Sequence, residues 1–172
     1  MAGDESATRT GGSLDERLRA LEDREEIRNL EGRYARTWDA GDGAGWAALF
    51  TPDGVWQALA GGSQTPANLV RGRAELEAFC NGCAGRVTGL HFLHLNELEV
   101  DADEARSLVY FDFRGTMRSP GSPPEVRHQL VTGHYRVRYR RTDGGWRIAH
   151  RLEQPVAVEG ATWVGGMLDR SF

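Results

Sequence analysis

An apolar stripe with helical spacing runs through the first quarter of the chain. Apolar residues recur every three or four positions, which is the period of one helix face, at Leu14, Leu18, Leu21, Ile27, Leu30, Tyr34 and Trp38. Ser13 followed by Glu16 has the pattern of a capping box, and Gly41 offers the left-handed residue that commonly ends a helix. The pattern predicts one long amphipathic helix over residues 13–40, and the spacing is compatible with a bend near Asp23.

Shorter patterns follow this helix. Residues 43–50 (GAGWAALF) predict a short helix, and residues 55–60 (VWQALA) predict a first strand. Residues 71–82 (RGRAELEAFCNG) place apolar side chains between two glycines and predict a third helix, of about three turns.

The second half of the chain changes to strand patterns. Four strand-like runs are joined by turn-forming residues, and the runs are residues 86–100, 105–117, 125–141 and 145–158. Such joints are typical of hairpins, so the runs predict a four-stranded antiparallel meander. Helices first and a meander last indicate an α+β domain. Long strands that curl around the helices would leave a concave face, where a small molecule would bind.

Composition narrows the class of partner. A chain of 172 residues suits one domain, which we place at residues 13–172 after a small polar segment, residues 1–12, that we expect to be disordered. The net charge of -4 argues against nucleic acid and anionic membranes as partners. The chain contains no apolar run of about 18 residues, and its first residues lack the apolar core of a signal peptide. We therefore expect a cytoplasmic protein that binds a hydrophobic small molecule.

Two cysteines raise the question of a metal or redox site. Cys80 and Cys83 have the spacing of a redox or half-zinc motif, but no second pair accompanies them. We interpret them as reduced, partly buried thiols. No histidine pair has a metal-binding spacing near a carboxylate, and no nucleotide-binding fingerprint follows a predicted strand. We therefore expect neither a metal nor a cofactor.

Three stretches of the chain carry a family resemblance. Residues 23–56, 89–105 and 133–151 resemble the SnoaL-like branch of the superfamily named after nuclear transport factor 2, in order and with plausible spacing over about residues 20–152. The resemblance implies a conical barrel, in which a curved antiparallel sheet wraps around a long N-terminal helix and encloses a deep pocket, with two further short helices. It also implies a homodimer or homotrimer that assembles through the sheet.

The resemblance is most specific at three residues. Tyr34 and Asp39 match a tyrosine and an aspartate of the bile-acid dehydratases, and His91 matches their pocket histidine. Scytalone dehydratases and hexachlorocyclohexane dehydrochlorinases are similar at the same aspartate and histidine. The resemblance implies that Asp39 and His91 remove a proton while a hydroxyl or chloride leaves. The base of a ketosteroid isomerase would fall near Ala58, which disfavours that mechanism.

Physical chemistry supports these roles but leaves alternatives open. A carboxylate at a helix C-terminus costs about 0.3 to 1 kcal/mol, so Asp39 breaks a local rule and needs a reason. In a catalytic dyad, His91 would accept a proton and Asp39 would stabilise the imidazolium, and Tyr34 would donate a hydrogen bond to substrate oxygen. Alternatively, Asp39 forms a turn, His91 is a core histidine, and Tyr34 is a core residue with its hydroxyl at the surface.

Further side chains are expected to line the pocket. Strand parity and the helix face predict substrate-binding residues at Trp38, Trp56, Tyr110, Asp112, Gln129 and Tyr135. The dehydratases carry another acidic residue on the second meander strand, where this chain has Phe113, and a bulge there would turn Asp112 inward. Arg151 is the nearest candidate for an arginine of those enzymes. The C-terminal segment, with Trp163 and Met167, would cover the pocket, seal a subunit contact or remain loose.

These observations predict a cofactor-independent lyase of the dehydratase type. Its substrate would be a hydrophobic cyclic molecule, such as a steroid, terpenoid or polyketide intermediate, and Asp39, His91 and Tyr34 would be its catalytic residues. The alternatives are an isomerase or polyketide cyclase in the same pocket, or a small-ligand-binding domain without catalysis.

Overall fold

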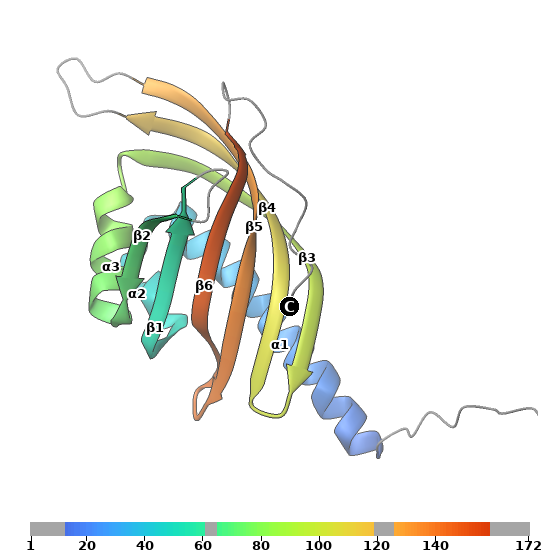
Figure 1. The fold of residues 1–172 in the computed structure, drawn as a ribbon. Coiled ribbons are helices and arrows are strands. Elements are labelled where there is room, and N and C mark those ends of the chain that lie inside the picture. Colours follow the sequence, from blue (N-terminus) through green and yellow to red (C-terminus); the bar gives the residue numbers. More distant parts are fainter. Residues whose placement is uncertain (1–12, 61–64, 119–125, 159–172) are drawn as a thin grey trace, which may run out of the picture.

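The computed structural model describes residues 13–60, 65–118 and 126–158. In these residues the chain forms three helices and one curved six-stranded sheet (Figure 1). The elements are α1 Leu14–Asp39, α2 Gly43–Ala48, β1 Phe50–Leu59, β2 Pro66–Arg71, α3 Gly72–Cys83, β3 Val87–Asp101, β4 Glu104–Arg118, β5 Val126–Thr142 and β6 Gly145–Val158. The segments 1–12 and 159–172, for which a disordered tail and a pocket cover were expected, lie outside the described residues.

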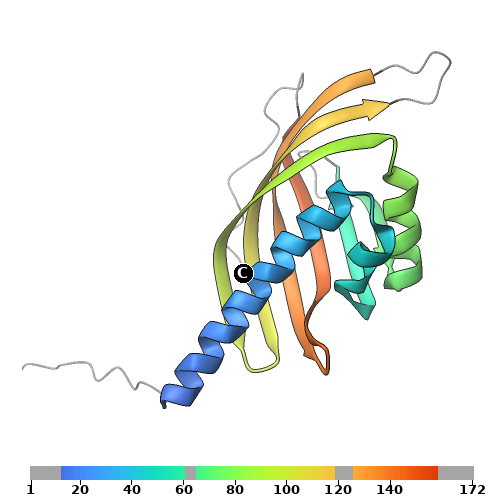
Figure 2. The same ribbon diagram turned by 180° about the vertical axis from the view of Figure 1, so that it is seen from behind.

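The predicted long helix is present as α1. Ser13 and Glu16 form the expected capping box, and Gly41 follows the helix with a φ of 67°. α1 runs without interruption past Asp23. The apolar stripe is buried only in its second half, because the first turns of α1 extend beyond the sheet (Figure 2) and leave Leu14 76% exposed.

The sheet has the strand order β2-β1-β6-β5-β4-β3. Strands β3 to β6 form the predicted antiparallel meander. β3 and β4 pair along their whole length, from Val87↔Met117 to Asp101↔Glu104, with one shift of register. The sheet is not wholly antiparallel, because β1 pairs in parallel with β6. Strand β2 was not predicted, since it is an edge strand with one buried position and begins at a proline.

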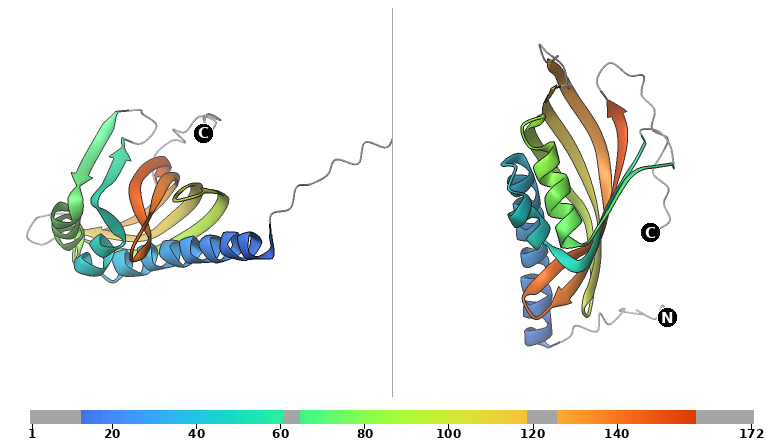
Figure 3. Two further views of the ribbon diagram at one scale, coloured as in Figure 1. Left: turned by 90° about the horizontal axis from the view of Figure 1, so that it is seen from below. Right: turned by 90° about the vertical axis from the view of Figure 1, so that its left-hand side faces the viewer.

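The helices all lie on the concave side of the curved sheet (Figure 3). α1 packs across β3 and β6, and α3 packs against β1 and α2. The core between these layers is rich in aromatic rings, and Trp46, Trp146, Tyr135, Tyr139 and Phe50 are among its largest fully buried side chains. A curved sheet wrapped around a long helix is the arrangement that the resemblance implied, and it leaves the aromatic side chains of both layers facing each other.

No helix among the described residues combines the length and the apolar character that crossing a membrane requires.

Candidate functional site

A cavity of about 140 Å³ lies between the concave face of the sheet and helices α1 and α3. Its walls are mostly aromatic and aliphatic, and the lining side chains are Tyr34, Trp38, Trp56, Phe79, Val87, His91, Phe111, Phe113, Gln129, Val131, Tyr135 and Glu153. A larger hollow of about 550 Å³ is lined by charged side chains of β3 to β6, including Glu104 and Arg138. We regard the aromatic cavity as the candidate site, because apolar walls with a few convergent polar groups are typical of small-molecule sites.

Asp39 and His91 are in direct contact at the edge of this cavity. Oδ1 of Asp39 lies 2.6 Å from Nδ1 of His91, and Oδ2 accepts a hydrogen bond of 2.9 Å from the backbone N–H of His91. Both side chains are largely buried, 12% and 9% exposed. An ionised carboxylate can only accept, so in a neutral imidazole at this position Nδ1 carries the proton and Nε2 presents its lone pair. The turn-only interpretation of Asp39 is thus wrong, whereas the catalytic role of the pair remains a prediction.

The two members of this pair border different spaces. His91 lines the aromatic cavity, whereas Asp39 lines a neighbouring hollow of about 210 Å³ together with Cys80 and Cys83. The ring of Phe113 packs on the imidazole with the centroids 4.8 Å apart. Asp39 therefore contacts the imidazole from the side of the neighbouring hollow. It could orient the ring, but it does not line the cavity in which a ligand would bind.

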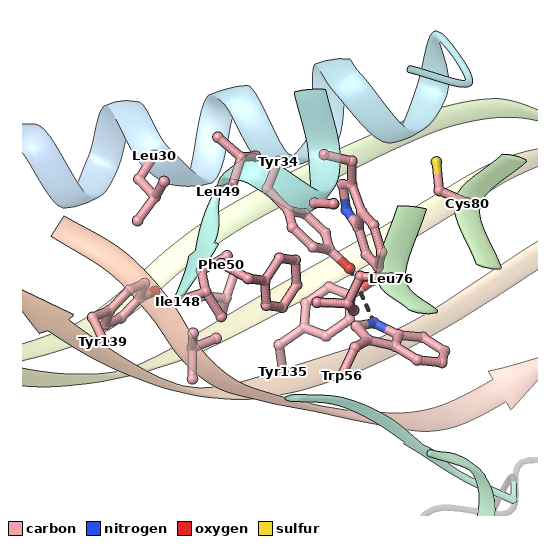
Figure 4. Packing of buried hydrophobic residues seen from close by; sticks show 14 of the residues in the cluster. Leu30, Tyr34, Leu49, Phe50, Trp56, Leu76, Cys80, Tyr135, Tyr139 and Ile148 are labelled. Carbon is pink, nitrogen blue, oxygen red and sulfur yellow. Dashed lines mark hydrogen bonds between the residues drawn. The ribbon is translucent and has the colours of Figure 1, made fainter. Parts of the chain in front are cut away.

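Tyr34 projects from α1 into the cavity wall (Figure 4). Its hydroxyl oxygen accepts a hydrogen bond of 3.2 Å from Nε1 of Trp56, which leaves the phenolic proton for another acceptor. Burial raises the pKa of Tyr34 well above its ordinary value. Tyr34 is therefore a neutral hydrogen-bond donor at physiological pH.

The guanidinium of a buried arginine, Arg151, packs on the ring of Tyr34. The guanidinium carbon of Arg151 lies 3.7 Å from the ring centroid of Tyr34 and 3.9 Å from that of Tyr135. Its Nη1 donates to both oxygens of Glu31 at 2.8 and 2.9 Å, and Glu31 also accepts from the hydroxyl of Tyr139 at 2.7 Å. Arg151 thus contacts the rings of two tyrosines that line the cavity, but it does not line the cavity itself.

Four of the six predicted substrate-binding residues line the cavity, namely Trp38, Trp56, Gln129 and Tyr135.

Tyr110 and Asp112 were placed wrongly in the pocket. The expected bulge in β4 is absent, since Phe113 pairs with His91 and Asp112 pairs with Phe92 in regular register. Alternation therefore directs Phe113 inward and Asp112 to the opposite face, where Asp112 accepts a hydrogen bond of 2.7 Å from Thr132.

Glu153 is the polar lining residue that sequence reasoning missed. It lies on β6 two positions after Arg151, so both share one strand face. Burial raises the pKa of the Glu153 carboxyl to about 7, and the positive charge of Arg151 opposes that rise. The parity of Arg151, which was already a candidate, was the signal that could have identified Glu153.

The cysteine pair carries no sign of metal binding. Both thiols are free, and burial raises the pKa of Cys80 to about 11 and also raises that of Cys83. In the described residues, no group of three or more histidine, cysteine, aspartate or glutamate side chains is arranged to hold a metal ion.

Comparison with known proteins identifies the family and the fold. The family model of the SnoaL-like domain matches residues 19–152. No protein of curated function matches the chain. An NTF2-like protein with a cystatin-like fold from Novosphingobium aromaticivorans is 27% identical, with a TM-score of 0.65 over 92% of this chain and 94% of that chain.

Two structural relatives with lower identity have names that denote reactions. A type 2 hexachlorocyclohexane dehydrochlorinase is 17% identical, with a TM-score of 0.69 over 83% of this chain and 90% of that chain. A proposed scytalone dehydratase from Novosphingobium aromaticivorans is 16% identical, with a TM-score of 0.68 over 87% of this chain and 93% of that chain. At these identities the likeness shows the fold alone.

Proposed function

Because this chain belongs to the SnoaL-like domain family, we propose that it is a cofactor-independent lyase that removes water from a hydrophobic cyclic molecule. The observation that carries the proposal is the 2.6 Å contact between Asp39 and His91 at the wall of the aromatic cavity. A carboxylate that holds a neutral imidazole in one tautomer makes its other nitrogen a proton acceptor near neutral pH.

The proposed reaction begins with removal of a proton from carbon. Nε2 of His91 takes a proton from a carbon beside a carbonyl group, and Asp39 stabilises the imidazolium that forms. Tyr34 donates a hydrogen bond to the carbonyl oxygen, where negative charge develops in the transition state. The electron pair of the C–H bond becomes the new double bond, and the C–O bond on the next carbon breaks with its electron pair on oxygen, which takes a proton from an acid of the site or from solvent and leaves as water.

The shape and chemistry of the cavity support a ring-containing substrate. Trp38 and Trp56 stack with an interplanar angle of 17°, and Phe79 packs against Trp56 with the ring centroids 4.8 Å apart. Flat apolar walls favour a steroid, terpenoid or polyketide ring over a flexible or highly charged molecule. The reactions named for the dehydrochlorinase and the proposed dehydratase are eliminations as well, which is consistent with the proposal.

An isomerase is the second candidate, and one observation favours it. The resemblance puts the base of an isomerase near residue 58, which is an alanine, but Ala58 is the register partner of Glu153 in the sheet. A carboxyl group on the adjacent strand, together with His91, would provide two groups that move a proton between two carbons. A polyketide cyclase would use the same cavity, and a non-catalytic binding domain would need the cavity but not the dyad.

Two probe reactions test the dyad. The ring of 5-nitrobenzisoxazole opens when a base removes its C–H proton, and 3-hydroxycyclohexanone loses water to give an enone. We expect Asp39→Asn and His91→Ala each to lower kcat/KM in both reactions by about 100-fold or more, with little change in Tm.

Asp53→Asn is the matched control, because Asp53 is an exposed carboxylate that pairs with Arg140 outside the cavity. The control should leave both rates unchanged. Wild-type rates in His91→Ala or Asp39→Asn would contradict the proposed dyad. If the protein binds cyclohexenone, the product of the dehydration, but turns over neither probe, the binding-domain alternative is favoured.

A further inference from the structure

We infer that Glu153 is a second acid/base group of this pocket and protonates the oxygen that leaves, while His91 takes the proton from carbon. The inference rests on the proposed function and deepens it, because it assigns the acid of the elimination and the kind of leaving group that the site is built for.

The position of Glu153 is the first reason. It lies in the middle of the sheet, paired with Tyr135 on β5 and with Ala58 on β1. Its side chain lines the same cavity as His91, and it is the only carboxylic acid among the described residues that line this cavity. A ligand in contact with His91 would therefore lie in the space that the Glu153 carboxyl also borders.

The lack of a partner is the second reason. In the part of the chain that the structure describes, no hydrogen bond or ion pair joins the Glu153 carboxyl to another residue. The carboxyl is partly withdrawn from water, so a ligand in the cavity would supply hydrogen bonds that the protein does not. A half-buried carboxyl that instead faces an apolar cavity is available to a ligand.

The titratable groups around Glu153 come from α1, β3, β5 and β6. The titratable groups that share the cavity or approach it are Tyr34 and Glu31 of α1, His91 of β3, Tyr135 of β5 and Arg151 of β6. The walls from β1 and α3 contribute Trp56 and Phe79, which do not titrate. Arg151 is already bound to Glu31 through Nη1, so its charge opposes protonation of Glu153 only in part.

The proton affinity of Glu153 suits a general acid. Burial raises the pKa of this carboxyl to about 7, so roughly half of the molecules carry the proton at pH 7. Acid catalysis is most effective when the pKa of the donor lies near the working pH. The pKa of Tyr34 is raised much further from neutrality, so Tyr34 is a hydrogen-bond donor and Glu153 is the stronger acid.

The proton and electron balance of the step is complete. His91 gains the proton from carbon, the C–H electron pair forms the double bond, and the C–O bond breaks with its electron pair on oxygen. That oxygen takes the proton of Glu153 and leaves as water. The site then holds imidazolium and carboxylate, and proton exchange with solvent returns both groups to their starting forms.

An acid of this kind matters only for a poor leaving group. Hydroxide is a strong base and leaves slowly without a proton, whereas a nitrophenolate leaves without help. Glu153 should therefore be needed for dehydration and should be dispensable when the leaving group is already stable as an anion.

The experiment compares the two probes in Glu153→Gln and in His91→Ala. We expect Glu153→Gln to lower kcat/KM for dehydration of 3-hydroxycyclohexanone by about 100-fold or more, and to change ring opening of 5-nitrobenzisoxazole by less than about threefold. His91→Ala should slow both reactions. Glu99→Gln, which removes an exposed carboxylate paired with Arg106, is the matched control and should slow neither.

The outcomes separate the inference from the proposed function. Equal slowing of both probes in Glu153→Gln, or slowing of neither, would overturn the role of Glu153 while His91→Ala still supports the dyad. If the wild-type protein accelerates neither probe, the proposed function fails and the role of Glu153 as leaving-group acid falls with it.

A titration that needs no substrate reads the acid directly. Carbon-13 NMR of protein labelled at glutamate carboxyl groups should show one resonance that titrates near pH 7 and that disappears in Glu153→Gln. If every glutamate resonance titrates below about pH 5, close to the ordinary value, Glu153 holds no proton at neutral pH and the inference is wrong.

Discussion

Replacing Glu31 with glutamine would leave the guanidinium of Arg151 buried without its carboxylate. Nη1 of Arg151 donates to both oxygens of Glu31, and the arginine side chain is 0% exposed. Removing one partner of a buried ion pair costs about 3–5 kcal/mol, because the remaining charge stays desolvated. Glutamine keeps one acceptor oxygen, and the rings of Tyr34 and Tyr135 still contact the cation. We therefore expect Glu31→Gln to lose about 3 kcal/mol, the lower end of that range.

Urea unfolding followed by tryptophan fluorescence measures this loss, since Trp46 and Trp146 are fully buried. In a domain of this size about 3 kcal/mol corresponds to a fall in Tm of about 6–12 °C. Glu99→Gln breaks an exposed ion pair and should cost less than about 1 kcal/mol. If Glu31→Gln loses no more stability than the control, the argument that the buried pair of Glu31 and Arg151 stabilises this part of the core is refuted.

Two further changes test the surroundings of the cavity. The raised pKa of Glu153 means that its protonated form favours folding, so this contribution is present below pH 4.5 and is lost as the pH rises through about 7. Glu153→Gln should match the wild type near pH 4.5 and exceed it at pH 8 by up to about 3 kcal/mol; equal differences in urea unfolding at both pH values would contradict this. A methyl group at Gly89 would clash with the backbone carbonyl oxygen of Arg114 and with the Phe113 ring that packs on His91, so Gly89→Ala should lose about 1–3 kcal/mol and open 5-nitrobenzisoxazole more slowly. Gly82→Ala, where a methyl group meets nothing within 4 Å, is the control, and an equal loss there would refute the clash.

The layers of the fold followed from local patterns. The capping box at Ser13, the stop at Gly41 and the alternating meander strands are short-range signals, and the structure confirms all three. The parallel pairing of β1 with β6 joins segments about 95 residues apart, and nothing in either segment marks its partner. The edge strand β2 was missed because its side chains are mostly exposed and form no alternating pattern.

The contact between Asp39 and His91 was the part of the candidate site that could be predicted from the sequence. The contact of Asp39 with His91 could be expected from the resemblance and from the unfavourable place of a carboxylate at a helix end. The wall residues depended on strand register, which parity alone does not determine. Asp112 was placed inward on the assumption of a bulge that β4 lacks, and Glu153 was overlooked although it shares the face of Arg151.

The two oxygens of Asp39 have different partners, and this has a consequence for how the site could change its chemistry. One oxygen contacts the imidazole of His91, while the other accepts from the backbone N–H of the same residue, which every residue except proline would supply. One of the two contacts that attach the helix end to β3 therefore does not depend on the side chain at position 91. Substitution at His91 could replace the proton acceptor while the helix stays docked, whereas replacing Asp39 with a residue that has no side-chain acceptor would weaken the attachment and the acceptor together. The reactive group can in this way vary independently of the scaffold that holds it.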